Sequence, residues 1–326
     1  MNLNIYDQDM NRISIIGNRY VSCLWEEGYN TVQKFTLELQ ETEEFRKKIR
    51  PDFYVGRNDR KTMMVIKTVQ IKYGKIIASG SQATRVLDDV NFVGTIKADS
   101  VISDSIKGAY DSSNGYRAVE FAEGNLPDSY DSQISNKSIL CLCETMCQSV
   151  DVGFRSVRGS GKIFIELYKP EENPNLIYSE KYGNLIVDSI TLSTEKQKNY
   201  AVVLGAGEGA NRTRVDVDVT NGEDRREIIV DAKDLQVEDG ETDSEYRARL
   251  YARGLEKLLE NQRTWECAFT PISKDFGSRF DLGDVLTVSL PEYNLKLKAR
   301  VSKFSQKAQQ NKVNTTIEVG DITITR

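Results

Sequence analysis

Hydrophobic and polar residues alternate along much of the chain, and this alternation predicts β-strands. It is clearest over residues 31–39, where Phe35, Leu37 and Leu39 stand at every second position between polar residues. Tyr73 and Gly74 predict a hairpin turn, and residues 41–49, with acids before bases, predict a short helix. The other strands predicted in this part of the chain are 2–6, 12–16, 22–26, 53–55, 63–72 and 75–79.

A glycine-rich hairpin is predicted in the second half of the chain. An apolar run at 200–204 leads into a loop that holds Gly205, Gly207 and Gly209, and residues 212–220 alternate strictly after it. A dinucleotide-binding loop has the spacing GxGxxG and opens a helix, and a P-loop ends in Gly-Lys-Ser/Thr. This loop has the spacing GxGxG, has no lysine and opens a strand. It is therefore predicted to be a turn and not a phosphate site.

The apolar spacing changes to a helical period at 99–109, 138–150 and 241–259. The last of these helices begins with Thr242 and Glu245, the pattern of a capping box. Gly254 interrupts it at a cost of about 1 kcal/mol relative to alanine, so we expect close packing there. Residues 108–124 are predicted to be an exposed loop. Further strands are predicted at 152–157, 162–168, 177–179, 185–193, 227–231, 264–269, 285–290, 295–304 and 313–320.

The composition removes several classes of function. The chain has 326 residues, a net charge of −5 and no histidine, which excludes Ser-His-Asp and Cys-His catalysis and histidine-ligated zinc. Neutralising DNA phosphates requires an excess of Lys and Arg, so the charge argues against a protein that wraps nucleic acid. The sequence holds no run of about 18 apolar residues, and its N-terminus lacks the basic and apolar regions of a signal peptide. We therefore expect synthesis in the cytoplasm and no membrane insertion.

Five cysteines raise the question of a metal site. Cys141, Cys143 and Cys147 lie close together, but a structural zinc site needs four ligands, and only Cys23 and Cys267 remain as distant partners. Cys143 and Cys147 also fall on the apolar stripe of the helix predicted at 138–150, which favours small buried side chains. An odd number of cysteines without an export signal fits reduced thiols. We expect no bound metal and no cofactor.

Two acidic patterns have both a chemical and a structural interpretation. Asp216, Asp218 and Glu227 have spacing similar to that of a calcium loop, but the segment alternates like a strand, which favours a polar sheet face. The acidic pairs at 43–44, 88–89 and 171–172 could be catalytic carboxylates, although the sequence does not place any two pairs together in space. Trp25 and Trp265 are expected in the core and not on a surface that stacks bases.

Several segments together resemble a known family. They are residues 201–209 with Arg212 and Arg214, the strand 31–39, the segment FDLGDVLTV at 280–288, and the closing strands 295–304 and 317–320. In order and spacing they resemble the hub, or tail-associated, proteins of long-tailed phages and prophages, a family similar in fold to the baseplate hub of contractile-tailed phages. The resemblance covers nearly the whole chain.

This resemblance implies an α+β, β-rich fold with two barrel-like β domains, a mixed α/β middle domain and a helical insertion. Residues 1–93 are then the first ring domain, and residues 196–235 with 275–326 are the second. Residues 94–195 form a mixed peripheral domain, and residues 236–274 form a helix-bearing insertion packed on it.

The function implied by the resemblance is structural and not enzymatic. The protein is expected in the virion, at the tail tip or baseplate, as a homotrimeric ring that closes the tail tube and forms part of the channel through which DNA leaves during ejection. The expected partners are a distal tail or tail-tube protein, a tape-measure protein, a tail fibre or receptor-binding protein, and DNA that passes without specific binding. The residues expected at an interface are Gly205, Gly207, Gly209, Arg212 and Arg214, and those expected to face the lumen or solvent are Asp216 and Asp218.

Two alternatives stay open. The chain could be a tail-associated cell-wall hydrolase that uses carboxylates, which requires a cleft holding an Asp or Glu of raised pKa. It could also be a surface adhesin or carbohydrate-binding protein, which requires an export route and a ligand.

Overall fold

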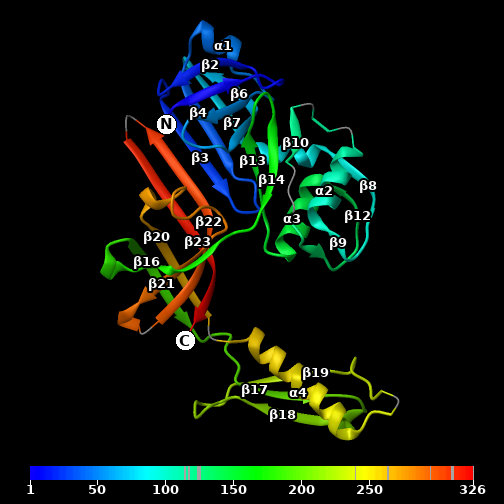
Figure 1. Ribbon diagram of the computed structural model, residues 1–326. Coiled ribbons are helices and arrows are strands. Elements are labelled where there is room, and N and C mark those ends of the chain that lie inside the picture. Colours follow the sequence, from blue (N-terminus) through cyan, green and yellow to red (C-terminus); the bar gives the residue numbers. More distant parts are fainter. Residues whose placement is uncertain are drawn as a thin grey trace. The chain divides into compact units, whose positions relative to one another are not determined.

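The computed structural model describes residues 1–113, 115–116, 118–122, 126–238, 240–262, 264–293, 295–309 and 312–325 (Figure 1). The chain forms two compact units. Unit 1 consists of Met1–Ile186 and Phe269–Arg326, and unit 2 consists of Val187–Ala268. Among the described residues, no helix is both long enough and apolar enough to cross a membrane.

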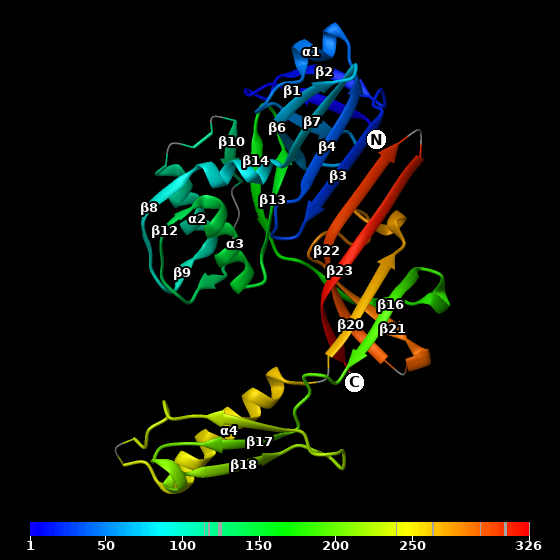
Figure 2. The same ribbon diagram turned by 180° about the vertical axis from the view of Figure 1, so that it is seen from behind.

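An 11-stranded sheet forms the framework of unit 1, in the order β15-β21-β22-β3-β4-β7-β6-β5-β1-β2, with β23 also paired to β22. The 15-residue strand β22 joins the chain's ends, because its residues 303–309 pair with β3 and its residues 295–300 pair with β21 (Figure 2). The strands are β1 (Leu3–Tyr6), β2 (Arg12–Gly17), β3 (Ser22–Gly28), β4 (Lys34–Gln40), β5 (Tyr54–Arg57), β6 (Met63–Lys72), β7 (Lys75–Gln82), β15 (Glu172–Tyr178), β21 (Val285–Leu290), β22 (Leu295–Gln309) and β23 (Lys312–Thr325).

The alternation seen in the sequence decides which face of each strand is buried in this sheet. Phe35, Leu37 and Leu39 on β4 are at most 1% exposed, and the Phe35 ring meets Trp25 edge-on at 5.7 Å between centroids. The predicted turn between β6 and β7 is confirmed, with positive φ at both Tyr73 and Gly74, as a tight hairpin turn requires. The short predicted helix is also confirmed as α1 (Glu43–Lys48).

The β-rich α+β class is confirmed by these elements. Among the described residues, the row of paired strands runs from β15 to β2, and no hydrogen-bonded pairing joins these two ends. The two barrel-like domains therefore stay a prediction.

The middle of unit 1 is a mixed α/β segment whose buried side chains form one cluster with Tyr54, Met63 and Val65 of the large sheet. Helices α2 and α3 contact each other, and β14 pairs parallel with β10 and antiparallel with β13. Val119 and Phe121 are buried, so the expectation of an exposed loop over 108–124 is wrong at these residues. The elements are η1 (Ala83–Asp89), β8 (Asn91–Ile96), β9 (Ser100–Val101), α2 (Ile102–Asp111), β10 (Val119–Phe121), β11 (Ser129–Tyr130), β12 (Ile134–Ser138), α3 (Ile139–Ser149), β13 (Gly153–Arg158), β14 (Ile163–Tyr168) and η2 (Glu180–Tyr182).

Cys143 and Cys147 lie on the buried face of α3 and are 0% exposed, as predicted for small apolar side chains. Burial raises the pKa of the Cys147 thiol to about 12, so this side chain stays protonated and unreactive at neutral pH. No group of three or more His, Cys, Asp or Glu residues in the described part of the chain is arranged to hold a metal ion. Cys267 and Trp265 fall where side chains lie outside the described residues.

Unit 2 is a three-stranded sheet covered by one helix. β17 (Tyr200–Leu204) lies between β18 (Arg214–Asp218), which is antiparallel to it, and β19 (Glu227–Asp231), which is parallel. The predicted capping box of Thr242 and Glu245 is confirmed at the start of α4 (Asp243–Glu260), which lies along the sheet (Figure 1). Of the remaining elements, η3 (Gly209–Asn211) lies in unit 2, and β16 (Leu185–Ser193) and β20 (Thr264–Pro271) each extend across a boundary between the units. η4 (Ser273–Asp275) and η5 (Pro291–Tyr293) belong to unit 1.

The domain division expected from the family resemblance stays a prediction, and the strand pairing of its segments is as follows. Residues 196–235 were expected to share a barrel with residues 275–326, but β17, β18 and β19 pair only with one another among the described strands. Their apolar face packs on α4, whereas β21, β22 and β23 belong to the large sheet of unit 1. The helix α4 thus covers the apolar face of this three-stranded sheet.

Gly254 and Gly108 should respond in opposite directions to replacement by alanine. A Cβ at Gly254 would lie 2.6 Å from Val217 Cγ2 and 2.7 Å from Val203 Cγ2, whereas a Cβ at Gly108 in α2 meets nothing within 4 Å. We expect Gly254→Ala to lower the free energy of unfolding by about 1 kcal/mol, because overpacking outweighs the gain in helix propensity. Gly108→Ala should raise it by up to about 1 kcal/mol. Urea denaturation followed by circular dichroism measures both, and equal changes would contradict the close packing seen at Gly254.

Candidate functional site

The glycine loop predicted as a turn does connect β17 to β18, so the hairpin is confirmed. Gly207 and Gly209 have φ values of +112° and +54°, which a residue with a Cβ rarely adopts. Gly205 is required for a different reason, since a Cβ there would lie 2.7 Å from Leu250 Cδ1 on α4. The Tyr246 hydroxyl accepts a hydrogen bond from Ala206 N at 2.7 Å. The glycines therefore shape this loop and let it approach the helix.

Arg212 stabilises the same loop through contacts within unit 2. Its Nε donates to the Gly205 carbonyl at 2.8 Å, and its guanidinium pairs with Asp231 at 2.5 Å. The Arg212 side chain is only 12% exposed, so most of its hydrogen-bond donors are used within unit 2.

Asp216 and Asp218 lie on the exposed side of β18. Arg214 Nε donates to Asp216 at 2.8 Å, and this hydrogen bond is the main cause of a lowered Asp216 pKa. Hydrogen bonds from Thr220, first from its backbone N–H, lower the pKa of Asp218. Both acids are thus held ionised on a strand, as the sheet-face interpretation of the sequence expects.

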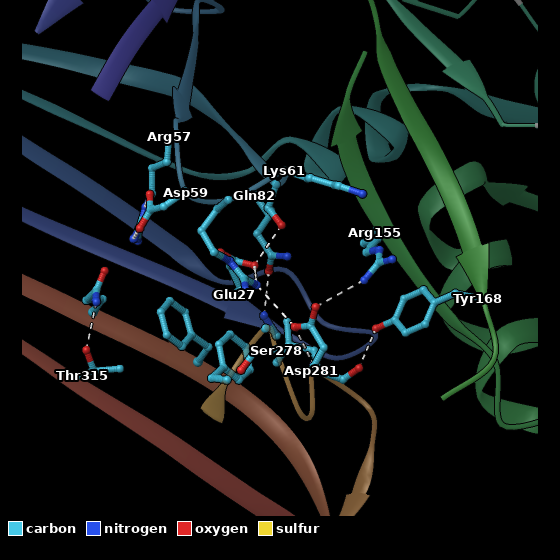
Figure 3. A pocket seen from close by; sticks show the side chains of 18 of the residues that line it. Glu27, Arg57, Asp59, Lys61, Gln82, Arg155, Tyr168, Ser278, Asp281 and Thr315 are labelled. Atoms are coloured by element: carbon cyan, nitrogen blue, oxygen red, sulfur yellow. Dashed lines mark hydrogen bonds and ion pairs between the residues drawn. The ribbon is translucent and has the colours of Figure 1, made fainter. Parts of the chain in front are cut away.

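A polar cleft in unit 1, with a volume of about 540 Å³, brings together more charged side chains than the hairpin does (Figure 3). Its walls come from the ends of β3 and β7, the connection between β5 and β6, the strands β13 and β14, the segment 274–282 and the β22–β23 pair. Residues far apart in sequence therefore form one surface.

Glu27 is the most deeply buried acid of this cleft, at 1% exposure. It accepts hydrogen bonds from Trp25 Nε1 at 2.7 Å and from Thr62 Oγ1 at 2.8 Å. Arg60 binds it with two nitrogens, Nε at 3.0 Å and Nη2 at 2.6 Å, which is the bidentate geometry of a strong ion pair. Burial alone would raise the pKa of Glu27, but Arg60 and these hydrogen bonds outweigh it and keep the pKa below its usual value. Glu27 is therefore a fixed negative charge and a poor proton donor.

The segment 280–288 is one of those that carry the resemblance to tail hub proteins. It folds back on itself beside the cleft. Asp284 accepts hydrogen bonds from Asp281 N at 2.7 Å and from Glu171 N at 2.8 Å. Asp281 Oδ1 lies 3.4 Å from Arg60 Nη2, and Asp281 Oδ2 lies 3.5 Å from Arg155 Nη1. Figure 3 shows the ion pair of Asp281 with Arg155. The two aspartates thus attach this segment to strands more than a hundred residues earlier in the chain.

Aromatic rings hold the cleft's arginines in place. The Arg60 guanidinium carbon lies 4.6 Å from the Phe276 ring centroid and 5.1 Å from that of Phe304, and these two rings stack at 4.4 Å. Arg155 lies 4.4 Å over Tyr168 in the same way. Such cation–π contacts fix the direction of each guanidinium, so the cleft has a preorganised arrangement of positive charge.

The sequence analysis missed this cleft, although β3 held a signal for it. Cys23, Trp25 and Glu27 occupy alternate positions, so the buried face that holds Cys23 and Trp25 must also hold Glu27. A buried carboxylate needs a cationic partner, and that partner, Arg60, is 33 residues away. The acidic pairs at 43–44 and 171–172 do not line the cleft.

The fold is that of phage tail proteins. The chain is similar to the prophage tail protein gp18 from Listeria monocytogenes EGD-e, with a TM-score of 0.59 and 11% identity over 98% of this chain and 94% of that one. It is also similar to the 43 kDa tail protein of prophage MuSo2 from Shewanella oneidensis, with a TM-score of 0.55 and 11% identity over 98% of each chain. For the tail protein from Neisseria meningitidis MC58 the TM-score is 0.50, with 10% identity over 98% and 96% of the two chains.

Residues 115–321, more than half of the chain, match the family of Siphovirus ReqiPepy6 Gp37-like proteins, and the chain belongs to that family. A search of curated protein sequences gives no match. The resemblance to phage tail proteins that the sequence analysis stated is confirmed.

Proposed function

We propose that the protein is a structural component of a phage or prophage tail, and that it forms a homotrimeric hub ring at the distal end of the tail tube. The observation that carries this proposal is the fold, which is shared with prophage tail proteins over nearly the whole chain. Membership of a siphovirus protein family supports the same role.

In this proposal the strands of residues 1–93 form the first ring domain, and the C-terminal strands of residues 275–326 are the centre of the second. The hydrogen bonds between β3 and β22 support a rigid wall, because they join these two parts into one sheet. A trimer then presents two ring-forming parts per subunit, six in all, which suits a sixfold tail tube. The neighbours in the tail are a distal tail or tail-tube protein, the tape-measure protein and a fibre or receptor-binding protein.

The net charge of −5 supports a channel through which DNA passes without binding, since like charges repel the phosphate backbone. Asp216 and Asp218, which are exposed and ionised, are proposed to face the lumen or solvent. The loop with Gly205, Gly207 and Gly209 and the adjacent Arg212 and Arg214 is proposed as a contact with another subunit.

A structural role fits the chemistry of the cleft better than hydrolysis does. A carboxylate-based hydrolase needs an acid whose pKa is raised so that it can donate a proton. In the cleft Glu27 has a lowered pKa, and Asp59 and Asp281 both contact arginines.

The native mass of the purified chain tests the trimer. Light scattering across a concentration series should give a species near three times 36.9 kDa, or about 111 kDa. Electron micrographs of that species should show a ring with a central opening. A stable dimer at every concentration would contradict the ring and favour an enzyme or an adhesin.

A further inference from the structure

We propose that the polar cleft of unit 1 binds an acidic peptide segment, that is, a stretch of another protein chain that carries Asp or Glu side chains. The proposal concerns unit 1 alone and does not depend on the trimeric ring. It follows from the charge of the cleft, from polar atoms left without partners, and from the spacing of its cations.

The charge of the cleft is opposite to that of the protein. Three acids and five basic residues line it, which leaves an excess of two positive charges in a chain whose net charge is −5. A local positive site on a negative protein attracts an anionic group at short range and selects against neutral ones. The acids are Glu27, Asp59 and Asp281, and the basic residues are Arg57, Arg60, Lys61, Arg155 and Lys274.

The acids of the cleft are already neutralised by its arginines. Glu27 pairs with Arg60, Asp59 pairs with Arg57 at 2.5 Å, and Asp281 contacts Arg60 and Arg155. Lys61 and Lys274 are exposed, and neither forms an ion pair within the described part of the chain. The two lysines are therefore the charges available to a ligand.

Arg57 adds a buried donor to the wall of the cleft. Its side chain is 2% exposed, and its Nε and Nη2 donate to Asp59, but its Nη1 has no hydrogen-bond partner among the described residues. The Gln306 Oε1 acceptor in another wall is also without a partner there. A buried polar atom without a partner is destabilising, so a ligand that supplies an acceptor for Arg57 and a donor for Gln306 would be favoured after small rotations of these two side chains.

This combination favours a peptide over a small anion. Phosphate offers oxygen acceptors at one point, whereas a peptide offers carboxylates, carbonyls and N–H donors along its length. Figure 3 shows Arg57 on one side of the cleft and Lys61 extending toward Arg155 on the other, so the positive groups do not converge on one point. The rings of Phe276, Phe304 and Tyr168 add apolar surface for the aliphatic parts of a peptide.

Fluorescence anisotropy of a fluorescein-labelled hexaglutamate peptide with the full chain tests the proposal at low ionic strength. The double variant Lys61→Glu/Lys274→Glu should weaken binding by about tenfold or more, because two attractions become repulsions. The matched control Lys97→Glu/Lys181→Glu changes the net charge equally at exposed lysines that do not line the cleft, and should change the affinity less than about twofold. Equal effects of the two double variants, or no binding by the wild type, would overturn the proposal.

One further variant tests the place of the site, and two further ligands separate the sources of the anionic group. Gln306→Glu adds a negative charge to the wall at nearly constant side-chain shape, and it should weaken peptide binding several-fold while circular dichroism stays unchanged. A labelled oligothymidine of equal charge should bind more weakly than the peptide, and inorganic phosphate should not displace the peptide at equal concentration. Tighter oligothymidine binding that Lys61→Glu/Lys274→Glu abolishes would assign the cleft to nucleic acid, and displacement by phosphate would assign it to a small anion. Either result would contradict a peptide site.

Discussion

Replacing Arg60 by methionine should lower the free energy of unfolding by about 3–5 kcal/mol at neutral pH, because it leaves Glu27 as a buried charge without its cation. Glu27 is 1% exposed and the Arg60 side chain is 13% exposed, so solvent screens their ion pair only slightly. Urea denaturation followed by tryptophan fluorescence measures the loss, and Trp25, whose Nε1 donates to Glu27, reports it locally.

An exposed ion pair supplies the control. Arg46 pairs with Glu41 at 2.6 Å, as close as Arg60 to Glu27, but its side chain is 60% exposed. Arg46→Met should therefore cost less than about 1 kcal/mol. The double variant Arg60→Met/Glu27→Gln should recover much of the loss, since the buried charge is then gone. An Arg60→Met variant no less stable than Arg46→Met would mean that the ion pair does not hold the connection between β5 and β6 to the end of β3 as described.

Replacing Gly80 by alanine should lower the free energy of unfolding by about 3 kcal/mol or more, because the new methyl group would overlap the main chain of β6. A Cβ at Gly80 would overlap the Val65 carbonyl oxygen and would lie 3.1 Å from Ile66 Cα. The pairing of β6 with β7 is irregular between Ile66 and Thr68, so Gly80, which pairs with Ile66, lies next to a bulge where the main chains approach closely. Backbone atoms cannot move aside as a flexible side chain does.

The neighbouring residue Ser79 gives a matched comparison for Gly80. It lies on the same strand and is half-buried, and Ser79→Ala removes one oxygen without adding volume. Its free energy of unfolding should stay within about 0.5 kcal/mol of the wild type. Thermal and urea denaturation of the two variants should differ clearly, and a Gly80→Ala protein as stable as Ser79→Ala would show that β6 and β7 are not packed as described.

Local features of the fold could be predicted from the sequence because each depends on neighbouring residues. The alternation over 31–39 predicted β4, and Thr242 with Glu245 predicted the start of α4. The cost of a glycine inside that helix predicted the close packing that Gly254 makes with Val203 and Val217. In each case the physical cause acts within one turn or one strand.

The pairing of distant segments could not be predicted in this way. β3 and β22 are separated by most of the chain, and many strands of similar alternation compete as partners. For the same reason the sequence did not reveal the cleft, in which Arg60 and Asp281 meet across 221 residues. The expected division of the second ring domain depends on family resemblance and not on pairing signals, so it stays a prediction. The packing of β17, β18 and β19 against α4 could not be predicted from these signals either.

The proposed peptide site and the proposed ring are independent of each other. The proposed peptide site would give the protein a defined attachment for a neighbouring protein, whereas the proposed ring depends on contacts between copies of this chain. Loss of peptide binding in Lys61→Glu/Lys274→Glu should therefore leave the native mass unchanged, because both lysines lie in unit 1, whereas the glycine loop proposed as a contact with another subunit lies in unit 2.

The position of the protein on the particle tests the central claim most directly. Virions produced from the genome that encodes this chain can be labelled with an antibody against it and a gold-conjugated second antibody, and then viewed by electron microscopy. We expect gold at the tail end farthest from the capsid. Gold along the tube or on the capsid, or particles that lack the protein on an immunoblot, would contradict a hub at the tail tip.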